Sequence, residues 1–307
     1  MKNKIGWIIG FVAFLVYLFT MADGPVGDSS AYFLAVSAGL LPKLNPLNYF
    51  SHLFIRLVIM FPIGSISFKA AFACALCGSL SVVLAYRVVS GVVSACIQET
   101  TATQRIRNLA ALSAGMGSAI YLAFCIPFWM VSNRAMSAAF DSLWLLFSAF
   151  LLLKYSETRR LGYAYLFSSI ICLGAVELAT FLTLIPLAAL YLVYLMWINE
   201  QFSPSTAIKS LLCALAGLSF YFIVGWFFVG SQGYLLREYT GGYWQVLWHF
   251  WRDQYLLLTR SLPQIGWLII LLSTVAPWLT AMLVAKRALN EEKDWTFYVL
   301  HIVMTFL

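Results

Sequence analysis

Long, uninterrupted runs of apolar residues dominate the hydropathy pattern of this chain. Nine runs are candidate spans when measured against the length of about 20 residues that a helix needs to cross a bilayer, and the last of them is too short as given. They lie at residues 5–21, 66–95, 109–128, 139–154, 162–178, 180–198, 210–230, 264–285 and 295–307. The pattern predicts an all-α polytopic membrane protein with about nine transmembrane helices, in a single transmembrane domain over residues 1–307. The ninth run stops in mid-helix at Leu307, so we expect the natural protein to continue beyond this residue.

Two of the segments between the runs are unusually long. Residues 22–65 contain two apolar stretches, 29–41 and 49–61, which are too short to span and are predicted to form helices along the membrane interface. Residues 231–263 are rich in Tyr and Trp. Such a segment is typical of the membrane–water boundary, and it would also suit a surface that binds sugar or lipid.

The composition supports a membrane protein and excludes a soluble one. Hydrophobic residues make up 62% of the chain and charged residues only 10%, and no soluble globule buries so much apolar surface. The net charge of +7 comes from scattered basic residues, so no nucleic-acid partner is predicted. Twelve of the 19 Lys and Arg residues fall on the side of the N-terminus. This bias predicts a cytoplasmic N-terminus in a multi-pass membrane protein.

Carboxylates are few, and those on the predicted outer side are the informative ones. Asp28 follows the first run by a few residues, and Asp141 begins a helix, where it suits an N-cap or a partner of the helix dipole. Glu177 falls in a tight turn between two apolar helices. A charge there needs a polar cavity or a partner, and Arg134 in the neighbouring outer turn is the expected one.

Motifs for several common chemistries are absent. The chain has no Walker loop, no H-E-x-x-H, no G-x-S-x-G and no Cys/His pairs at zinc spacing. We therefore predict no organic cofactor, and the sequence leaves a divalent metal open. The stretch 49–61 carries His52 and Arg56 on one polar edge of an otherwise apolar helix.

Several segments together resemble a known family. Residues 28–33 read DSSAYF and residues 44–49 read LNPLNY, where the family has D-[SC]-G-E-[FL]-I and H-P-P-G-x-P. Residues 68–87 resemble its next, Ser- and Ala-rich span, and residues 128–140 its F-W…A-E-V-Y segment. Over about the first 190 residues the chain is thus similar to the bacterial protein O-mannosyltransferase-like family (glycosyltransferase family 117) of the GT-C superfamily.

Three polar features of that family's motifs are missing here. The Glu of the first motif falls on Ala31, the Glu of the later motif falls near Ala138, and the His-Pro-Pro triplet is reduced to Asn45-Pro46. The layout of spans and loops therefore matches the family better than its polar motifs do. The resemblance implies a GT-C-like bundle with interfacial helices in the first outer loop.

The resemblance also implies a reaction, the transfer of a sugar from a polyprenyl-phosphate-linked donor to a protein or glycan acceptor on the outer, periplasmic face. Such a transfer needs a base for the acceptor hydroxyl, cations for the leaving phosphate and an apolar groove in contact with membrane lipid. Asp28 is the candidate catalytic base. The candidate substrate-binding residues are Glu177, Asp141, Arg134, Arg237, Arg252, His52 and Trp244.

Two other classes of protein remain open at this point. A non-catalytic relative that binds a lipid-linked sugar or acts as an assembly subunit would explain the missing Glu residues. A lipid or solute transporter is a further alternative, although the charges cluster at the ends of the runs and not at mid-membrane.

Overall fold

The computed structural model describes residues 2–22, 24–40, 48–62, 64–96, 104–229 and 241–260. All regular structure within these ranges is helical. The helices are α1 (Lys2–Phe19), α2 (Gly27–Ser37), α3 (Tyr49–Ile59), α4 (Ile66–Cys96), α5 (Gln104–Phe124), α6 (Ile126–Ser132), α7 (Ala138–Thr158), α8 (Leu161–Glu177), α9 (Thr180–Ile198), α10 (Pro204–Leu218), α11 (Phe220–Phe227) and α12 (Tyr243–Arg260).

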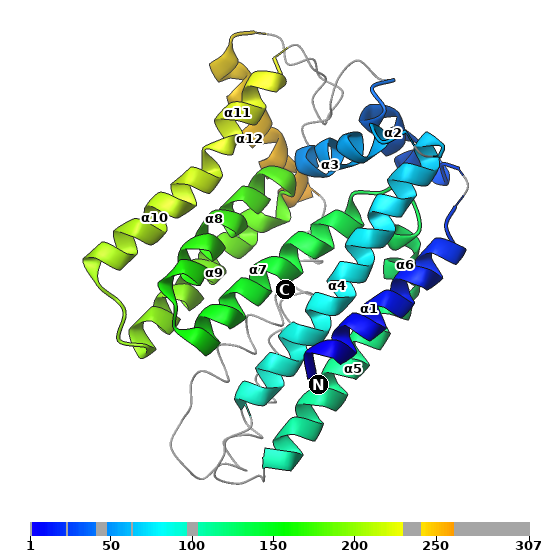
Figure 1. Ribbon diagram of the computed structural model, residues 1–307. Helices are drawn as coiled ribbons and strands as arrows, with labels where there is room; N and C mark the ends of the chain where they lie inside the picture. The colour runs from blue at the N-terminus through cyan, green and yellow to red at the C-terminus, as the bar shows by residue number, and fades with distance from the viewer. Residues whose placement is uncertain are drawn as a thin grey trace.

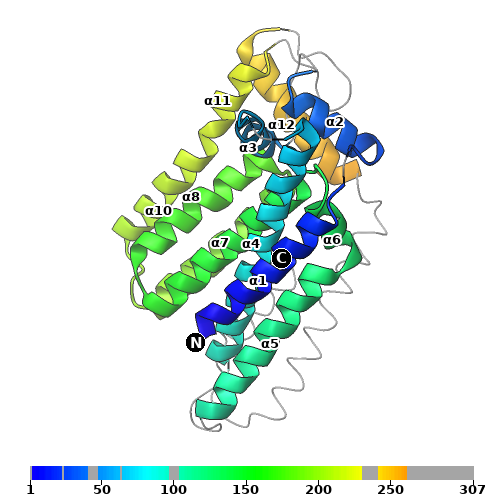
Figure 2. The ribbon, with the colours of Figure 1, turned by 45° about the vertical axis from the view of Figure 1, so that its right-hand side comes forward.

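The long helices run side by side in a bundle, and the short helices α2 and α3 lie across one end of it (Figure 1). We call this the α2–α3 end. The N-terminus lies at the opposite end, as the view turned by 45° also shows (Figure 2). The two half-length apolar stretches of the first long segment thus form two short helices, in agreement with the sequence pattern.

Four helices of the described part are long and apolar enough to cross a membrane. They cover Ile66–Ala95, Ala138–Thr158, Thr180–Ile198 and Pro204–Phe227, and a bent pair, α5 with α6, makes a fifth if it counts as one span. The several long apolar helices agree with the prediction of a membrane protein.

The predicted number of nine spans is not confirmed. The apolar helices Lys4–Phe19 and Leu161–Glu177 fall short of the full length, since 17 residues of helix rise only about 25 Å against a hydrocarbon core of about 30 Å. The run at 109–128 breaks at Cys125, where α5 and α6 meet at 64°. Pro127 in the first turn of α6 lacks the backbone N–H that a continuous helix would need. The runs 264–285 and 295–307 lie outside the described residues.

Small residues allow the helices to approach closely. A Cβ atom on Gly78 of α4 would collide with Ser132 of α6, and one on Gly217 of α10 would collide with the backbone of α8 at Ser169. Close backbone approach through small residues is the usual way in which membrane helices pack. One cluster of buried side chains, which includes Phe33, Ile55 and Ala139, joins α2 and α3 to α4 and α7. The two short helices are therefore packed on the bundle.

Candidate functional site

Glu177, the last residue of α8, is fully buried at the α2–α3 end. Its carboxylate accepts hydrogen bonds from the backbone N–H groups of Phe50 at 2.5 Å and Ser51 at 3.0 Å, and its carbonyl oxygen accepts one from the N–H of Asn48 at 3.0 Å. The first N–H groups of a helix have no partner within the helix and carry the positive end of its dipole. Glu177 therefore caps the N-terminus of α3 from a position 127 residues away in the chain.

The other end of α3 is held by a cation. The Lys69 ammonium group of α4 donates a hydrogen bond to the carbonyl oxygen of Ile59 at 2.9 Å. A carboxylate at the N-terminus and an ammonium at the C-terminus both complement the helix dipole. The position of α3 over the bundle is thus fixed at its two ends by charged side chains from α8 and α4.

Asp141 lies in the first turn of α7, and only 9% of it is exposed. Its Oδ2 accepts a hydrogen bond from the Asn48 side-chain amide at 3.1 Å, and its carboxyl group lies beside that of Glu177. The Ser137 side chain and the Glu177 carboxyl group also lie within reach of the Asp141 carboxyl group. Two buried carboxyl groups this close cannot both carry a full charge without a proton or a donor between them.

His52 is buried between α2 and α3. Its Nδ1 lies 2.8 Å from the Ser37 hydroxyl, and its ring lies 4.4 Å from that of Phe33. The Ser37 hydroxyl donates its single proton to the Phe33 carbonyl, so Nδ1 of His52 is the donor in the other contact. Burial lowers the pKa of His52 to about 4, which keeps the ring neutral at neutral pH. His52, which was expected to bind substrate, therefore connects α2 with α3.

Arg134 and Asp28 belong to two segments that are tied together. Asn133, next to Arg134, accepts a hydrogen bond from the N–H of Ala22 at 3.1 Å and donates one from its side-chain amide to the carbonyl of Thr20, also at 3.1 Å. These bonds attach the link between α1 and α2 to the turn before α7. Asp28 is the second residue of α2, a helix that begins a few residues after the attached Ala22.

The partner expected for Glu177 was Arg134, and the structure supplies a different one. Both carboxylate oxygens of Glu177 accept hydrogen bonds from the backbone of α3. A sequence shows where the charged side chains are, so it suggests them as partners. Any residue type except proline can supply a backbone N–H group at a helix N-terminus, so such a partner cannot be recognised from residue types. The buried charge is thus stabilised by a helix end.

Two of the remaining predicted site residues, Trp244 and Arg252, lie on α12. Arg252 is partly exposed, and its Nη2 lies 3.6 Å from Oδ1 of the buried Asp253. Trp244 is 71% exposed, and Arg237 lies outside the described residues. The Gln254 amide donates a hydrogen bond to the carbonyl of Ala175 at 3.2 Å, which attaches α12 to α8 two residues before Glu177.

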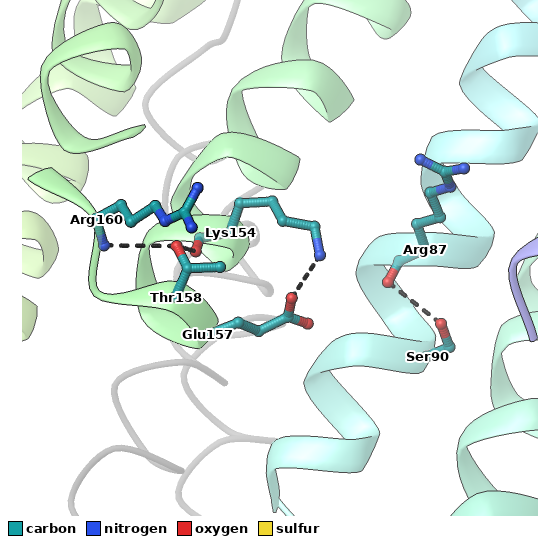
Figure 3. Close-up of polar contacts among 6 residues, drawn as sticks. All are labelled: Arg87, Ser90, Lys154, Glu157, Thr158 and Arg160. Atoms are coloured by element: carbon teal, nitrogen blue, oxygen red, sulfur yellow. Dashed lines mark hydrogen bonds and ion pairs between the residues drawn. The ribbon is translucent and has the colours of Figure 1, made fainter. Parts of the chain in front are cut away.

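The opposite end of the bundle has a different kind of polar contact (Figure 3). Lys154 pairs with Glu157 at 2.6 Å within α7, and the N–H of Arg160 lies 3.5 Å from the Thr158 hydroxyl. All the contacts drawn there join residues close together in the chain. At this same end the Tyr155 hydroxyl and the Gln201 side chain join segments 46 residues apart. At the α2–α3 end, the contacts Asn48–Asp141 and Phe50–Glu177 join segments 93 and 127 residues apart and bring two buried carboxyl groups together. The candidate site is therefore the α2–α3 end.

Asn48 is the site residue that sequence reasoning missed. An Asn immediately before an apolar helical stretch signals an N-cap, and Asn48 does occupy that position of α3. Its side chain, however, contacts Asp141 while Glu177 satisfies the helix end. Among the described residues no group of three or more His, Cys, Asp or Glu side chains is placed to hold a metal ion.

The fold and this site define the class of protein as a helical membrane protein with a buried polar centre at one end of its bundle. Within this class, the chain matches the family model of the protein O-mannosyl-transferase TMEM260 N-terminal domain over residues 45–202. The match covers slightly more than half of the chain, and the protein belongs to this family of glycosyltransferases. No curated protein and no solved structure matched the chain.

The matched range includes most of the polar centre. Asn48, His52, Lys69, Asp141 and Glu177 all fall between residues 45 and 202. The family match therefore covers the helices that carry these contacts, and it covers both ends of those helices alike. The match confirms the resemblance to an O-mannosyltransferase-like family that the loop and span motifs suggested.

Proposed function

We propose that the protein transfers a sugar from a polyprenyl-phosphate-linked donor to a protein or glycan acceptor at the α2–α3 end of its bundle. Membership of the O-mannosyl-transferase family is the observation that carries this proposal. The buried polar centre at that end supports it, because charged and polar side chains of α4, α7 and α8 meet α3 and Asn48 there.

Each part of the reaction has a candidate residue. Asp28, at the start of α2, is the proposed base that takes the proton of the acceptor hydroxyl as it attacks the sugar. Arg134, Arg237 and Arg252 are the proposed cations for the phosphate that leaves with the polyprenyl chain. The Asp141 carboxyl group, which lies beside that of Glu177, is suited to form a hydrogen bond with a sugar hydroxyl, and Trp244 to contact the prenyl chain where it enters the lipid.

The proposal gives two earlier candidates an indirect role. Glu177 and His52 have their polar atoms engaged with α3 and with Ser37, so we assign them to holding α3 and α2 in place. The N-terminus is proposed to lie in the cytoplasm of a bacterial cell, with the α2–α3 end on the periplasmic side of the inner membrane.

A non-catalytic role remains the second candidate, and a specific observation favours it. Ala31 and Ala138 stand where the resembling family has Glu. A binder of lipid-linked sugar would keep the polar centre and lose the transfer step.

One experiment separates the two candidates. The purified protein in nanodiscs is incubated with radiolabelled polyprenyl-phosphate mannose, and both retained donor and released polyprenyl phosphate are measured in the presence of an acceptor polypeptide. The enzyme predicts labelled acceptor and an equal amount of released carrier. Retention of donor without any labelled acceptor or released carrier would contradict the enzyme and favour the binder.

A further inference from the structure

One face of α12 exposes a stripe of large aromatic side chains. Trp244, Trp248, Trp251 and Tyr255 are 71%, 64%, 42% and 64% exposed. Their spacing of four, three and four residues places them on one line along the helix, over about 16 Å at the helical rise. A continuous line of exposed rings on a helix whose other side is buried indicates that this face contacts an apolar or partly apolar environment.

The other two faces of α12 are quite different. Val246, Leu247 and Phe250 are buried, together with the polar Asp253 and Gln254, so this face is fixed to the bundle. A third face, between the stripe and the buried side, carries Gln245, His249 and Arg252 at the same spacing of four and three residues. The aromatic stripe is thus bordered on one side by a polar stripe and on the other by protein.

The aromatic stripe continues from a membrane-spanning helix. The span Pro204–Phe227 includes α11, and Trp226 at its end is 70% exposed. The Trp226 ring lies 6.0 Å from that of Tyr243, and the Phe222 ring lies 6.4 Å from that of Trp244. The rings on α12 therefore begin where the lipid-facing surface of the bundle ends. In contrast, α12 itself is not among the described helices that are apolar enough to cross the membrane.

We propose that α12 lies in the head-group layer of the membrane, with its Trp and Tyr stripe in contact with lipid. Indole and phenol rings prefer this layer because one part of each ring is apolar and the other can donate a hydrogen bond. The neighbouring stripe of Gln245, His249 and Arg252 then faces water and lipid phosphates, as expected of an interfacial amphipathic helix. The partner of this surface is the bilayer itself.

This proposal is tested with a fluorescent label on two matched positions of the full chain. In a variant without native cysteines, Trp248→Cys places the label on the aromatic stripe and Gln245→Cys places it on the polar stripe less than one turn away. Each protein is reconstituted into phosphatidylcholine–phosphatidylglycerol nanodiscs. Quenching is measured with nitroxide lipids, labelled near the head group, and with iodide in the water. Neither measurement depends on transferase activity.

The proposal predicts opposite patterns at the two positions. The label at 248 is quenched several-fold more by the nitroxide lipids than the label at 245, and iodide quenches them in the reverse order. Strong and equal iodide quenching at both positions would overturn the proposal, and so would a label at 248 that neither quencher reaches. Protection of the 248 label from iodide by a soluble mannose oligosaccharide, without lipid quenching, would assign the stripe to sugar and also overturn it.

Discussion

Glu177 carries a buried charge without a basic side chain as its hydrogen-bond partner. An isolated carboxylate is very costly to bury unless donors surround it, and here the donors are the N–H groups of Phe50 and Ser51. Hydrogen bonds to a charged group contribute about 1.5–3 kcal/mol each. At the residue scale, this carboxylate attaches the N-terminus of α3 to α8 through two backbone hydrogen bonds.

Replacing Glu177 should therefore loosen the α2–α3 end. In Glu177→Gln the amide keeps one acceptor oxygen and turns an N–H group toward an N–H group of α3, so we expect a loss of about 2 kcal/mol or more in the free energy of unfolding. The matched control is Glu157→Gln, which removes an exposed pair with Lys154 and should cost less than about 1 kcal/mol. Thermal unfolding in detergent measures both, and equal shifts would contradict the assigned role.

The same measurement distinguishes the helix end from Arg134 as the partner of Glu177. Since both carboxylate oxygens are engaged by α3, the losses from Glu177→Gln and Arg134→Gln should add in the double variant. A double variant that recovers stability would show that the two side chains interact.

His52 should make stability depend on pH. Burial lowers the pKa of His52 to about 4 in the folded protein. At a pH below the ordinary histidine pKa of about 6.5, His52 is therefore protonated in the unfolded chain but stays neutral in the folded protein. The free energy of unfolding is unaffected above pH 6.5 and falls as the pH drops toward 4. Between pH 7 and pH 5 we expect a loss of about 2 kcal/mol, which His52→Gln should abolish. An identical pH profile for the two proteins would contradict this.

Sequence reasoning singled out several polar side chains at this scale but did not predict their partners. Glu177, Asp141 and His52 stood out because polar groups are rare and costly in apolar segments, and the structure brings all three to the α2–α3 end. Their partners are a helix end, an Asn side chain and a Ser hydroxyl. These come from segments up to 127 residues away, and no local pattern encodes such pairings.

At the scale of elements, α3 shows how a short helix is held without spanning the membrane. Its 11 residues are too few for a stable isolated helix. The carboxylate at its N-terminus and the Lys69 ammonium at its C-terminus each complement its dipole. The apolar stretch 49–61 was sufficient to predict the helix, but these two caps come from α8 and α4 and were not predictable from the stretch itself.

The C-terminal cap can be tested separately. Lys69→Met keeps the length of the side chain and removes its charge and donors, so the carbonyl of Ile59 loses its partner. We expect a loss of about 1 kcal/mol and faster hydrogen exchange at the backbone amides of α3. Lys209→Met on the exposed side of α10 is the control and should change neither. Unchanged exchange in α3 for Lys69→Met would show that the cap does not hold the helix.

At the scale of the whole molecule, the predicted membrane spans rest on hydropathy, and the predicted orientation rests on charge. Long apolar runs predicted the membrane-spanning helices of the described part where they were unbroken, as in α4 and α9. They did not predict the bend at Cys125 within the run 109–128, because hydropathy does not register a change of helix direction. Which end faces the cytoplasm follows only from the distribution of Lys and Arg.

Labelling in intact cells tests that orientation. In a variant without native cysteines, Ala31→Cys places a thiol on the exposed side of α2, and Gly162→Cys places one at the opposite end, where the added side chain meets open space. A membrane-impermeant maleimide should label position 31 in intact cells and position 162 only after the inner side is opened. The reverse order would show that the N-terminus lies outside.

The central claim is that sugar transfer takes place at the α2–α3 end with Asp28 as the base. Asp28→Asn keeps the size of the side chain and removes its basicity. Donor binding and transfer are measured together in nanodiscs, in a single turnover, with Glu157→Gln as a control at the other end of the bundle. The account predicts that Asp28→Asn binds the donor as the natural protein does and transfers no sugar, while the control transfers normally. Transfer at the natural rate by Asp28→Asn would contradict the claim.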